Sequence, residues 1–398
     1  MKRNLILTSL LFLNTILLSQ GSWLQKNSLP GNGRLASFAF SIGSNAYIGC
    51  GQTASSTYVS DFWEYNSEGI WTQKANFAGG IRYSPSAFTI DSIGYVCLGY
   101  TGQCKNDVWS YSPQTNTWTQ KNNFPGTARY GAFSFSIGTK GYIGMGSIGG
   151  PPFLTDFWEY NSAFDNWIQK TSYNNNVGRI HGLGITLNNK GFAGLGSDDG
   201  NGHSVNDFYE YSPLSNTWTQ KSNYPDARFG ISYFAINECA YVGTGFNNNM
   251  NYNNSLWKYD PLTNIWTSIA SVGSSGRSGG IGFAVGNNGF LGFGLTSSGS
   301  YLNDLWEYTP EASSIQKNTN REIANIRFDI ANRNILLTIN KLSQKASFKI
   351  YNISGQLISE NKINGLTQLI NINYLKKGSY IYIININGKI TSDKFIVH

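Results

Sequence analysis

The sequence repeats one pattern six times, and this repeat limits the possible folds more than any other feature. A tryptophan marks each copy, and in five copies a Gln-Lys pair begins two residues after it. The tryptophans are Trp23, Trp71, Trp118, Trp167, Trp218 and Trp266, spaced 47 to 51 residues apart. An arginine, an aromatic residue 13 positions after it and an Asp-x-Trp-x-Tyr pattern keep the same period. Markers that stay in register indicate one supersecondary unit repeated along the chain.

Each copy is expected to contain four short strands. In the third copy, residues 130–137, 141–146 and 156–160 have strand character, and the fourth strand begins at Trp167. Turns rich in Pro, Asn and Asp separate the strands, because these residues supply preset or left-handed backbone angles. A four-stranded antiparallel sheet repeated at this length is typical of a propeller blade. The sequence therefore predicts an all-β fold class with a six-bladed β-propeller over residues 22–309.

The two ends of the repeat region complement each other. The last copy has no tryptophan strand after Tyr308, and the chain begins with such a strand at Trp23–Lys26, before any other. We therefore predict that the N-terminal strand pairs with the strand of Trp306. This pairing would complete the sixth blade and remove an exposed sheet edge.

The repeat resembles the Kelch family, in which a glycine-rich second strand is followed by an Asp-x-Trp-x-Tyr strand, a turn and a tryptophan. The resemblance covers residues 22–309. The usual Gly-Gly pair of the second strand appears here as Gly-x-Gly, as in Gly144-Met145-Gly146. Tyr209 stands for the tryptophan in the fourth copy and Ser255 for the aspartate in the fifth. The resemblance implies a propeller, and none of these departures threatens that fold.

The C-terminal part differs from the repeats. Residues 310–323 are polar and unpatterned, as in a linker, and residues 324–398 contain six or seven short strands that indicate a small β-sandwich. Residues 350–356, 375–381 and 394–397 resemble the type A sorting domain of the bacterial type IX secretion system. The usual Pro-Asn-Pro opening is absent, and Phe328-Asp329-Ile330 stands near its place. The resemblance implies that type IX secretion machinery is a partner; the alternative is an accessory sandwich that itself binds a ligand.

The N-terminus has the pattern of a signal peptide. Lys2 and Arg3 precede an apolar run from Leu5 to Leu18, and small residues follow at Ser19 and Gly21. The run is shorter than the ~20 residues that a membrane-spanning helix needs. We therefore expect a cleaved signal peptide over residues 1–21 and no transmembrane anchor in the mature chain, the alternative being a retained anchor. Together with the tail, this predicts a protein secreted by a Gram-negative bacterium or displayed on its outer surface.

The net charge of +7 is unevenly distributed. Residues 22–309 carry 15 basic and 17 acidic residues, whereas residues 324–398 carry 10 and 3. The large domain has no basic excess, so nucleic acid is not an expected partner.

The four cysteines match no metal-site spacing. Cys97 and Cys104 are close enough in sequence for a local disulfide in an oxidising compartment. The alternative is that all four cysteines are small buried side chains.

One polar residue recurs in every copy. The six arginines are Arg34, Arg82, Arg129, Arg179, Arg228 and Arg277. Each is expected where an innermost strand begins, so that six guanidinium groups would surround one mouth of the central channel. Guanidinium pairs well with carboxylate, sulfate and phosphate, which suggests an anionic glycan or an acidic peptide as ligand. The alternative is a structural role, in which each arginine bonds the backbone and acidic residues of neighbouring blades.

The positions beside these arginines vary. His181 stands where the other copies have Ala36, Ser84, Gly131, Gly230 and Gly279. It is a candidate ligand contact, with a packed or solvated side chain as the alternative. Tyr83, Tyr130 and Phe229 follow their arginines directly and are candidates for stacking on sugars.

No catalytic residue, metal site or cofactor is assigned. The three histidines, His181, His203 and His398, do not suffice for the ligand sets of a copper oxidase or a metal hydrolase. The loops between markers barely vary in length, whereas catalytic propellers generally enlarge one or two of them. The sequence therefore favours a secreted or cell-surface Kelch propeller that binds protein or carbohydrate. A carbohydrate-active enzyme, such as a sugar epimerase or lyase, is the alternative, and a structural component of an extracellular assembly is a third possibility.

Overall fold

The structure is a computed structural model that describes residues 21–173, 177–310, 316–317, 324–329, 333–339, 346–353, 355–387 and 389–397. The predicted signal peptide lies outside the described residues except for Gly21, as does most of the predicted linker. In the described part of the chain, no helix has the length and apolar character needed to cross a membrane.

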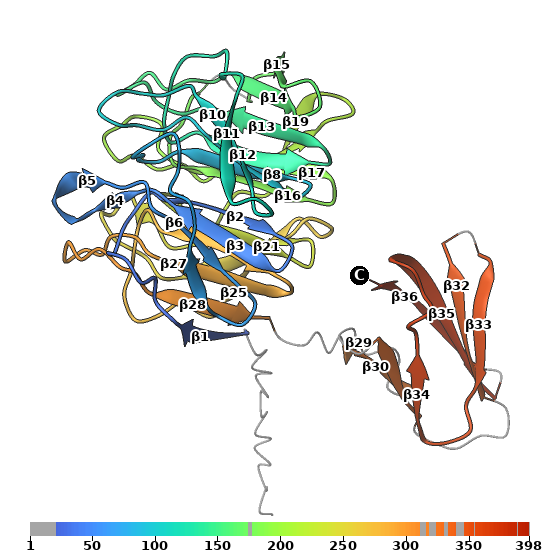
Figure 1. The fold of residues 1–398 in the computed structure, drawn as a ribbon. Coiled ribbons are helices and arrows are strands. Elements are labelled where there is room, and N and C mark those ends of the chain that lie inside the picture. The colour runs from blue at the N-terminus through green and yellow to red at the C-terminus, as the bar shows by residue number, and fades with distance from the viewer. Residues whose placement is uncertain are drawn as a thin grey trace, which may run out of the picture.

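The strands of residues 22–309 form six four-stranded antiparallel sheets (Figure 1). We number the sheets one to six in chain order of their innermost strands. Sheet one contains β2 (Phe38–Ile42), β3 (Asn45–Gly49), β6 (Phe62–Tyr65) and β7 (Trp71–Gln73). Sheet two contains β8 (Ser86–Ile90), β9 (Ile93–Cys97), β10 (Val108–Ser112) and β11 (Thr117–Lys121). Sheet three contains β12 (Phe133–Ile137), β13 (Lys140–Gly144), β14 (Phe157–Asn161) and β15 (Asn166–Lys170).

The other three sheets follow the same order from inside to outside. Sheet four contains β16 (Leu183–Leu187), β17 (Lys190–Gly194), β18 (Phe208–Ser212) and β19 (Thr217–Gln220). Sheet five contains β21 (Ser232–Ile236), β22 (Cys239–Gly243), β24 (Leu256–Asp260) and β25 (Ile265–Ile269). Sheet six contains β26 (Ile281–Val285), β27 (Asn288–Gly292), β28 (Leu305–Thr309) and β1 (Ser22–Lys26). Two short pairs lie in the loops: β4 (Gln52–Thr53) with β5 (Thr57–Tyr58), and β20 (Arg228–Phe229) with β23 (Phe246–Asn247).

The N-terminal strand completes sheet six. β1 pairs antiparallel with β28, from Ser22 opposite Thr309 to Lys26 opposite Leu305. The indole Nε1 of Trp23 donates a hydrogen bond to the carbonyl of Ala270, 2.9 Å away, in the segment that follows sheet five. The predicted pairing of this strand with the strand of Trp306 is therefore confirmed.

Aromatic side chains fill the space between neighbouring sheets. Phe38, Phe62 and Tyr111 belong to one buried cluster that spans sheets one and two, with the Phe62 and Tyr111 ring centroids 4.7 Å apart. The second strands carry glycines where rings from the preceding sheet approach. A Cβ on Gly141 would lie 2.2 Å from the ring of Phe88, so only glycine permits this approach. The repeated aromatic and glycine residues thus form the core, in keeping with their usual burial.

The six innermost strands surround a channel. β2, β8, β12, β16, β21 and β26 each contact the next in this order, and β26 contacts β2. The channel contains a cavity of about 390 Å³, lined by residues of these strands and of the segments just before them, among them Ala39, Phe88, Thr186 and Tyr233.

A cyclic set of backbone hydrogen bonds encircles one end of this channel. One residue just before each innermost strand donates its N–H to the carbonyl of its counterpart in the preceding sheet, over 2.7–3.1 Å. The six residues are Ala36, Ser84, Gly131, His181, Gly230 and Gly279, and all have positive φ, between 47° and 69°. The cycle closes because Ala36 donates to Gly279. We call these six residues the amide ring.

The tail forms two further sheets. The first contains β29 (Gln316–Lys317), β30 (Ala324–Asp329), β31 (Asn334–Ile339) and β34 (Thr367–Asn371). The second contains β33 (Leu357–Lys362), β32 (Ala346–Asn352), β35 (Gly378–Ile386) and β36 (Lys389–Val397). Ile335 and Ile370 of the first sheet share a buried cluster with Phe348, Ile350 and Tyr382 of the second. The tail therefore has a hydrophobic core of its own.

Candidate functional site

The recurring arginines lie buried within their own sheets. The Arg129 guanidinium is fully buried and donates to both carboxylate oxygens of Asp156, over 2.5 and 2.8 Å. It also donates to the carbonyl of Met145, which follows the second strand of the same sheet. Asp156 accepts a further bond from the Trp158 indole. Burial would raise the pKa of Asp156, but these hydrogen bonds and the Arg129 charge outweigh it and hold the pKa below its usual value.

Four other sheets repeat this arrangement. The pairs are Arg34 with Asp61, Arg82 with Asp107, Arg179 with Asp207, and Arg277 with Asp304. In sheet five, Ser255 replaces the aspartate. Arg228 donates to the Ser255 hydroxyl, 2.8 Å away, and its Nε donates to Asp226.

The arginines therefore do not form an open ring of cations. Each is at most 4% exposed and already bonded, so an anionic ligand could reach it only by displacing a carboxylate or, in sheet five, Ser255. The predicted anion site at these six residues is thus corrected: the arginines connect strands within each sheet. The structural role considered as the alternative placed the acidic partner of each arginine in a neighbouring blade. The structure instead places it in the same sheet as the arginine.

The residues that follow the arginines surround the amide ring. Each forms a β-bridge or short ladder with the loop between the second and third strands of its sheet. The pairs are Leu35 with Gln52, Tyr83 with Tyr100, Tyr130 with Ser147, Ile180 with Ser197, Phe229 with Phe246, and Ser278 with Leu295. The first residue of each pair lies between a recurring arginine and a residue of the amide ring. The paired residues therefore surround the end of the channel at the amide ring, and we call this end the mouth.

Four tyrosines gather on one side of the mouth. Tyr58 of sheet one lies 5.7 Å from Tyr83, Tyr83 lies 6.0 Å from Tyr130, and Tyr130 lies 5.4 Å from Tyr100, measured between ring centroids. All four side chains are partly exposed. Burial, and then the neighbouring tyrosines, raise the pKa of Tyr83 to about 12, so its hydroxyl remains a neutral donor. Tyr58, Tyr83, Tyr100 and Tyr130 form the tyrosine cluster.

His181 also contacts this cluster. It belongs to sheet four, yet its ring centroid lies 6.2 Å from those of both Tyr83 in sheet two and Tyr130 in sheet three. Its backbone belongs to the amide ring, and its Nε2 is buried with no hydrogen-bond partner. Burial lowers the pKa of His181 to about 4. The structure therefore brings three sequence candidates, Tyr83, Tyr130 and His181, into one place.

Replacing this histidine by glycine should reduce the sensitivity of the fold to acid. Between the ordinary pKa of 6.5 and the folded pKa of about 4, the unfolded chain binds a proton that the folded chain does not. Stability therefore falls as pH falls, by about 2 kcal/mol between pH 7 and pH 5 from this group alone. His181→Gly should remove that part of the loss, and glycine already occupies the position in three other sheets. Equal losses in both proteins, measured by denaturant unfolding, would contradict the buried neutral state of His181.

Phe229 lies in a second group of aromatic residues. Its ring is 5.5 Å from Phe246, which in turn lies 5.0 Å from Tyr252, all in sheet five. Among the residues that the structure describes, no ring of this group contacts a ring of the tyrosine cluster. Phe229 therefore belongs to the mouth but to a separate part of it.

Sequence reasoning missed two members of the tyrosine cluster. Tyr58 and Tyr100 lie in the loops between second and third strands. The sequence held a signal for both: Tyr58 recurs as Tyr252 and Tyr301, three residues before the recurring Asp or Ser, and Tyr100 directly follows the recurring glycine Gly99.

The cysteines form no disulfide. All four are free, and the two thiols of the predicted bond have different neighbours. Cys97 is buried and lies 3.6 Å from the Ser86 carbonyl, whereas Cys104 lies 3.7 Å from the Ser147 carbonyl in the next sheet. The disulfide prediction is therefore corrected. The alternative of full burial applies to Cys50 and Cys97, while Cys104 and Cys239 are only partly buried.

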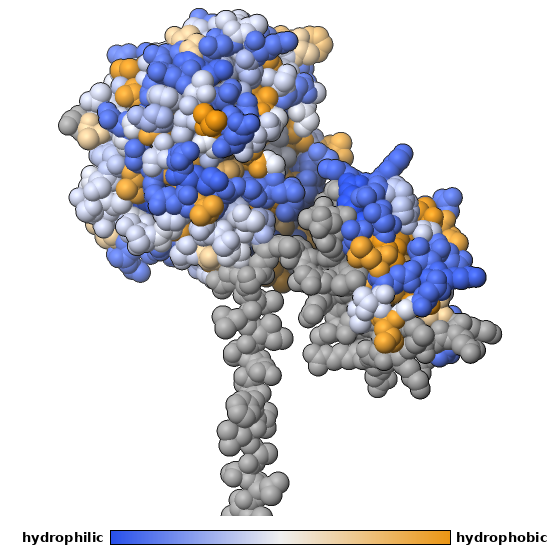
Figure 2. Space-filling model, turned by 60° about the horizontal axis from the view of Figure 1, so that its bottom comes forward, coloured by the Kyte–Doolittle hydropathy of each residue, from blue (hydrophilic) through white to orange (hydrophobic). Residues whose placement is uncertain are grey.

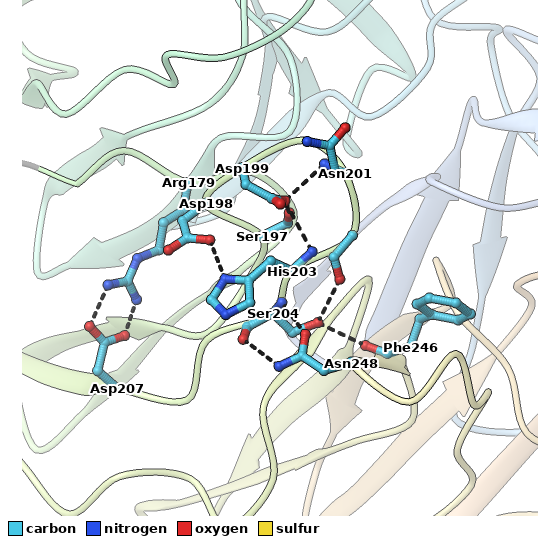
Figure 3. A network of polar contacts seen from close by, with 11 residues as sticks. Arg179, Ser197, Asp198, Asp199, Asn201, His203, Ser204, Asp207, Phe246 and Asn248 are labelled. Carbon is cyan, nitrogen blue, oxygen red and sulfur yellow. Dashed lines mark hydrogen bonds and ion pairs between the residues drawn. The ribbon is translucent and has the colours of Figure 1, made fainter.

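A polar loop of sheet four lies beside the mouth (Figure 3). Asp198 accepts from the His203 ring over 2.6 Å, and Asp199 accepts from the backbone of Asn201 and His203. Ser204 exchanges two hydrogen bonds with the Asn248 side chain of sheet five. These contacts hold the loop to its neighbour. In the described residues, no group of three His, Cys, Asp or Glu side chains is placed to hold a metal ion.

Known proteins resemble both parts of the chain. The family model of the secretion system C-terminal sorting domain matches residues 322–398, and the Kelch motif model matches residues 82–125 and 227–273. Among solved structures, one titled "Structure of YjhT", a Kelch-type propeller, is similar with a TM-score of 0.60. It is 17% identical, and the match covers 79% of this chain and 99% of that one, so it supports the fold alone. No curated protein matches the sequence.

The tail match carries information on location. A sorting domain of this kind indicates export through type IX secretion, and hence a protein that is secreted or held at the cell surface. The glycine-rich second strands, the Asp-x-Trp-x-Tyr strands and the tryptophan strands are the residues on which the similarity to the Kelch repeat rests. The chain therefore carries Kelch motifs in its repeat region, a fold similar to that of a Kelch-type propeller, and a C-terminal sorting domain of the type IX secretion system.

Proposed function

We propose that the chain has four parts: a signal peptide (1–21), a closed six-bladed propeller (22–309), a linker (310–323) and a β-sandwich sorting domain (324–398). The six four-stranded sheets, the closed cycle of innermost-strand contacts and the pairing of β1 with β28 support the propeller. The shared core of the two tail sheets supports the sandwich.

We propose further that the propeller is a carbohydrate-binding module. The observation that carries this proposal is the tyrosine cluster, in which rings from three sheets meet at the mouth beside His181. A tyrosine offers an apolar face to the C–H side of a sugar and a hydroxyl to its polar edge. The buried Nε2 of His181, which has no partner, adds a hydrogen-bonding atom to this region.

The protein-binding alternative has less support. A stable protein interface usually buries about 800 Å² on each partner around apolar anchors. On the side of the repeat region that Figure 2 shows, hydrophobic residues are scattered among hydrophilic ones rather than gathered into one large patch. A small aromatic site surrounded by polar loops fits a sugar chain better.

The geometry favours binding over turnover. The nearest recurring carboxylates, such as Asp107 and Asp156, are held by arginines, so they cannot act as free acids or bases. His181 has its pKa lowered to about 4, well below the value at which a general base works best near neutral pH. The epimerase or lyase alternative therefore gains no specific support from these groups.

A glycan array followed by calorimetry on the purified protein would test this function. We expect binding of at least one glycan class, with no product released on the same panel. Tyr83→Ala and Tyr130→Ala should each weaken binding about tenfold, because each removes a stacking surface. Tyr374→Ala is the matched control, since this exposed tyrosine lies in the tail. If neither Tyr83→Ala nor Tyr130→Ala changes the affinity for the glycan, the binding site is not at the mouth.

A further inference from the structure

We infer that the mouth takes an uncharged saccharide chain, bound across the amide ring and not threaded into the channel. This inference rests on the proposed function, and it replaces the anionic ligand that the arginines suggested. Three features of the mouth lead to it: the ion pairs that hold its arginines, the charges of its loops and the ring of hydrogen-bonded backbone beneath it.

No recurring cation is free to meet an anion. Five arginines are bonded to aspartates, and the sixth, Arg228, is bonded to Ser255 and Asp226. Because the guanidinium groups are buried, displacing an aspartate would leave a buried charge without its partner, which is strongly destabilising. A sulfate or uronate at the mouth would therefore lack the arginine fork that such groups favour.

The remaining charges of the loops are few and mostly acidic. The twelve loops at this end of the sheets are 27–37, 50–61, 75–85, 98–107, 122–132, 145–156, 171–182, 195–207, 222–231, 244–255, 270–280 and 293–304. Apart from the arginines and their five aspartate partners, they contain Lys105, Asp198, Asp199 and Asp226 as charged residues. Asp226 is bonded to Arg228, and Asp198 to His203 (Figure 3). One lysine among three carboxylates gives a polyanion little attraction, while the many Asn, Ser, Thr and Gly residues suit neutral hydroxyl groups.

The amide ring and the His181 side chain narrow the floor of the mouth. The amide ring lies at the end of the channel, and the cavity begins with the residues that follow it, such as Ser37, Pro85 and Ala132. The His181 side chain crosses from sheet four to the rings of Tyr83 and Tyr130. A ligand on the tyrosine cluster therefore lies over hydrogen-bonded backbone, and the chain of a polysaccharide must pass across the mouth.

The tyrosine rings are also unsuited to a flat crystalline surface. Tyr58 and Tyr83 are inclined by 33°, Tyr83 and Tyr130 by 53°, and Tyr58 and Tyr100 by 79°. Rings inclined in this way cannot all lie on one plane, but they can each face a different residue of a single twisting sugar chain. The structure thus favours a soluble neutral oligosaccharide.

Paired oligosaccharides would test the inference. The probes are neutral gluco-, galacto-, manno- and xylo-oligosaccharides of four to six residues, beside uronic acid and sulfated oligomers of equal length. We expect a neutral probe to bind about tenfold or more tightly than its acidic counterpart. Its affinity should change less than about twofold between 0.05 and 0.5 M NaCl, because an uncharged ligand is not screened. Lys105→Gln should leave that affinity unchanged, whereas Tyr83→Ala should lower it.

The outcomes separate this inference from the proposed function. Preference for an acidic probe, with loss of binding in salt or in Lys105→Gln, would overturn the neutral ligand but leave a carbohydrate-binding mouth. Failure of every oligosaccharide to bind would overturn the proposed function itself. A cyclic or end-capped neutral oligomer should bind as well as the open chain; a strict need for a free chain end would overturn binding across the mouth.

Discussion

A chain that starts at Pro30 is expected to melt about 10 °C or more below the chain that starts at Ser22. The truncation removes β1, all five residue pairs with β28, and the contacts of Trp23 with Phe234 and Tyr308. It also removes Leu29, which is 1% exposed. Loss of these two large apolar side chains alone costs about 5 kcal/mol or more, and in a domain of this size each kcal/mol lowers the melting temperature by about 2 °C.

Calorimetry or circular dichroism would measure this effect. The matched control is Leu24→Ala, since Leu24 is on the same strand but 62% exposed. It should melt within about 1 °C of the parent chain, because exposed substitutions have small effects. Equal melting temperatures for the truncated and parent chains would mean that β1 does not close the ring in solution.

Arg129→Ala is expected to destabilise the protein by about 3–5 kcal/mol, and Arg228→Ala by about 2 kcal/mol less. The first substitution leaves Asp156 partly buried without its partner, and this unpaired charge is the larger part of the cost. The second leaves the uncharged Ser255 hydroxyl and Asp226, whose side chain is 39% exposed and is therefore solvated by water when its partner is removed. The chain thus contains its own matched control for the buried ion pair. Denaturant unfolding of both variants would measure the difference, and equal losses would show that the carboxylate contributes little.

Much of the propeller was predictable because its repeat is regular. Each tryptophan, aspartate and glycine recurs where a sheet needs it, so periodicity alone identified the sheets and the role of β1. The partner of each arginine was less visible. Arg129 and Asp156 are 27 residues apart in sequence, and they meet only because β12 and β13 form a hairpin before the chain returns to β14.

The tyrosine cluster could be predicted only in part. Tyr83 and Tyr130 hold a fixed position after their arginines, so the repeat pointed to them. Tyr58 and Tyr100 also hold fixed positions in the repeat, before the recurring Asp or Ser and after the recurring glycine, but the period does not show that they contact Tyr83 and Tyr130. The disulfide prediction for Cys97 and Cys104 was wrong for another reason. The two cysteines are close in sequence, but the chain leaves β9 after Cys97, and the two thiols contact carbonyl groups of different sheets.

The amide ring limits how such a chain can evolve. Every member of the cycle gives one hydrogen bond and takes one, so it has no end to which another member could be added. A solenoid can gain a repeat at either end without disturbing the rest. Here, an extra copy would have to break the circle and re-form it at a larger radius. Duplication of a single repeat would therefore disrupt the propeller. Sequence changes in the loops around the mouth leave the ring intact, so we expect functional differences between such proteins to arise there.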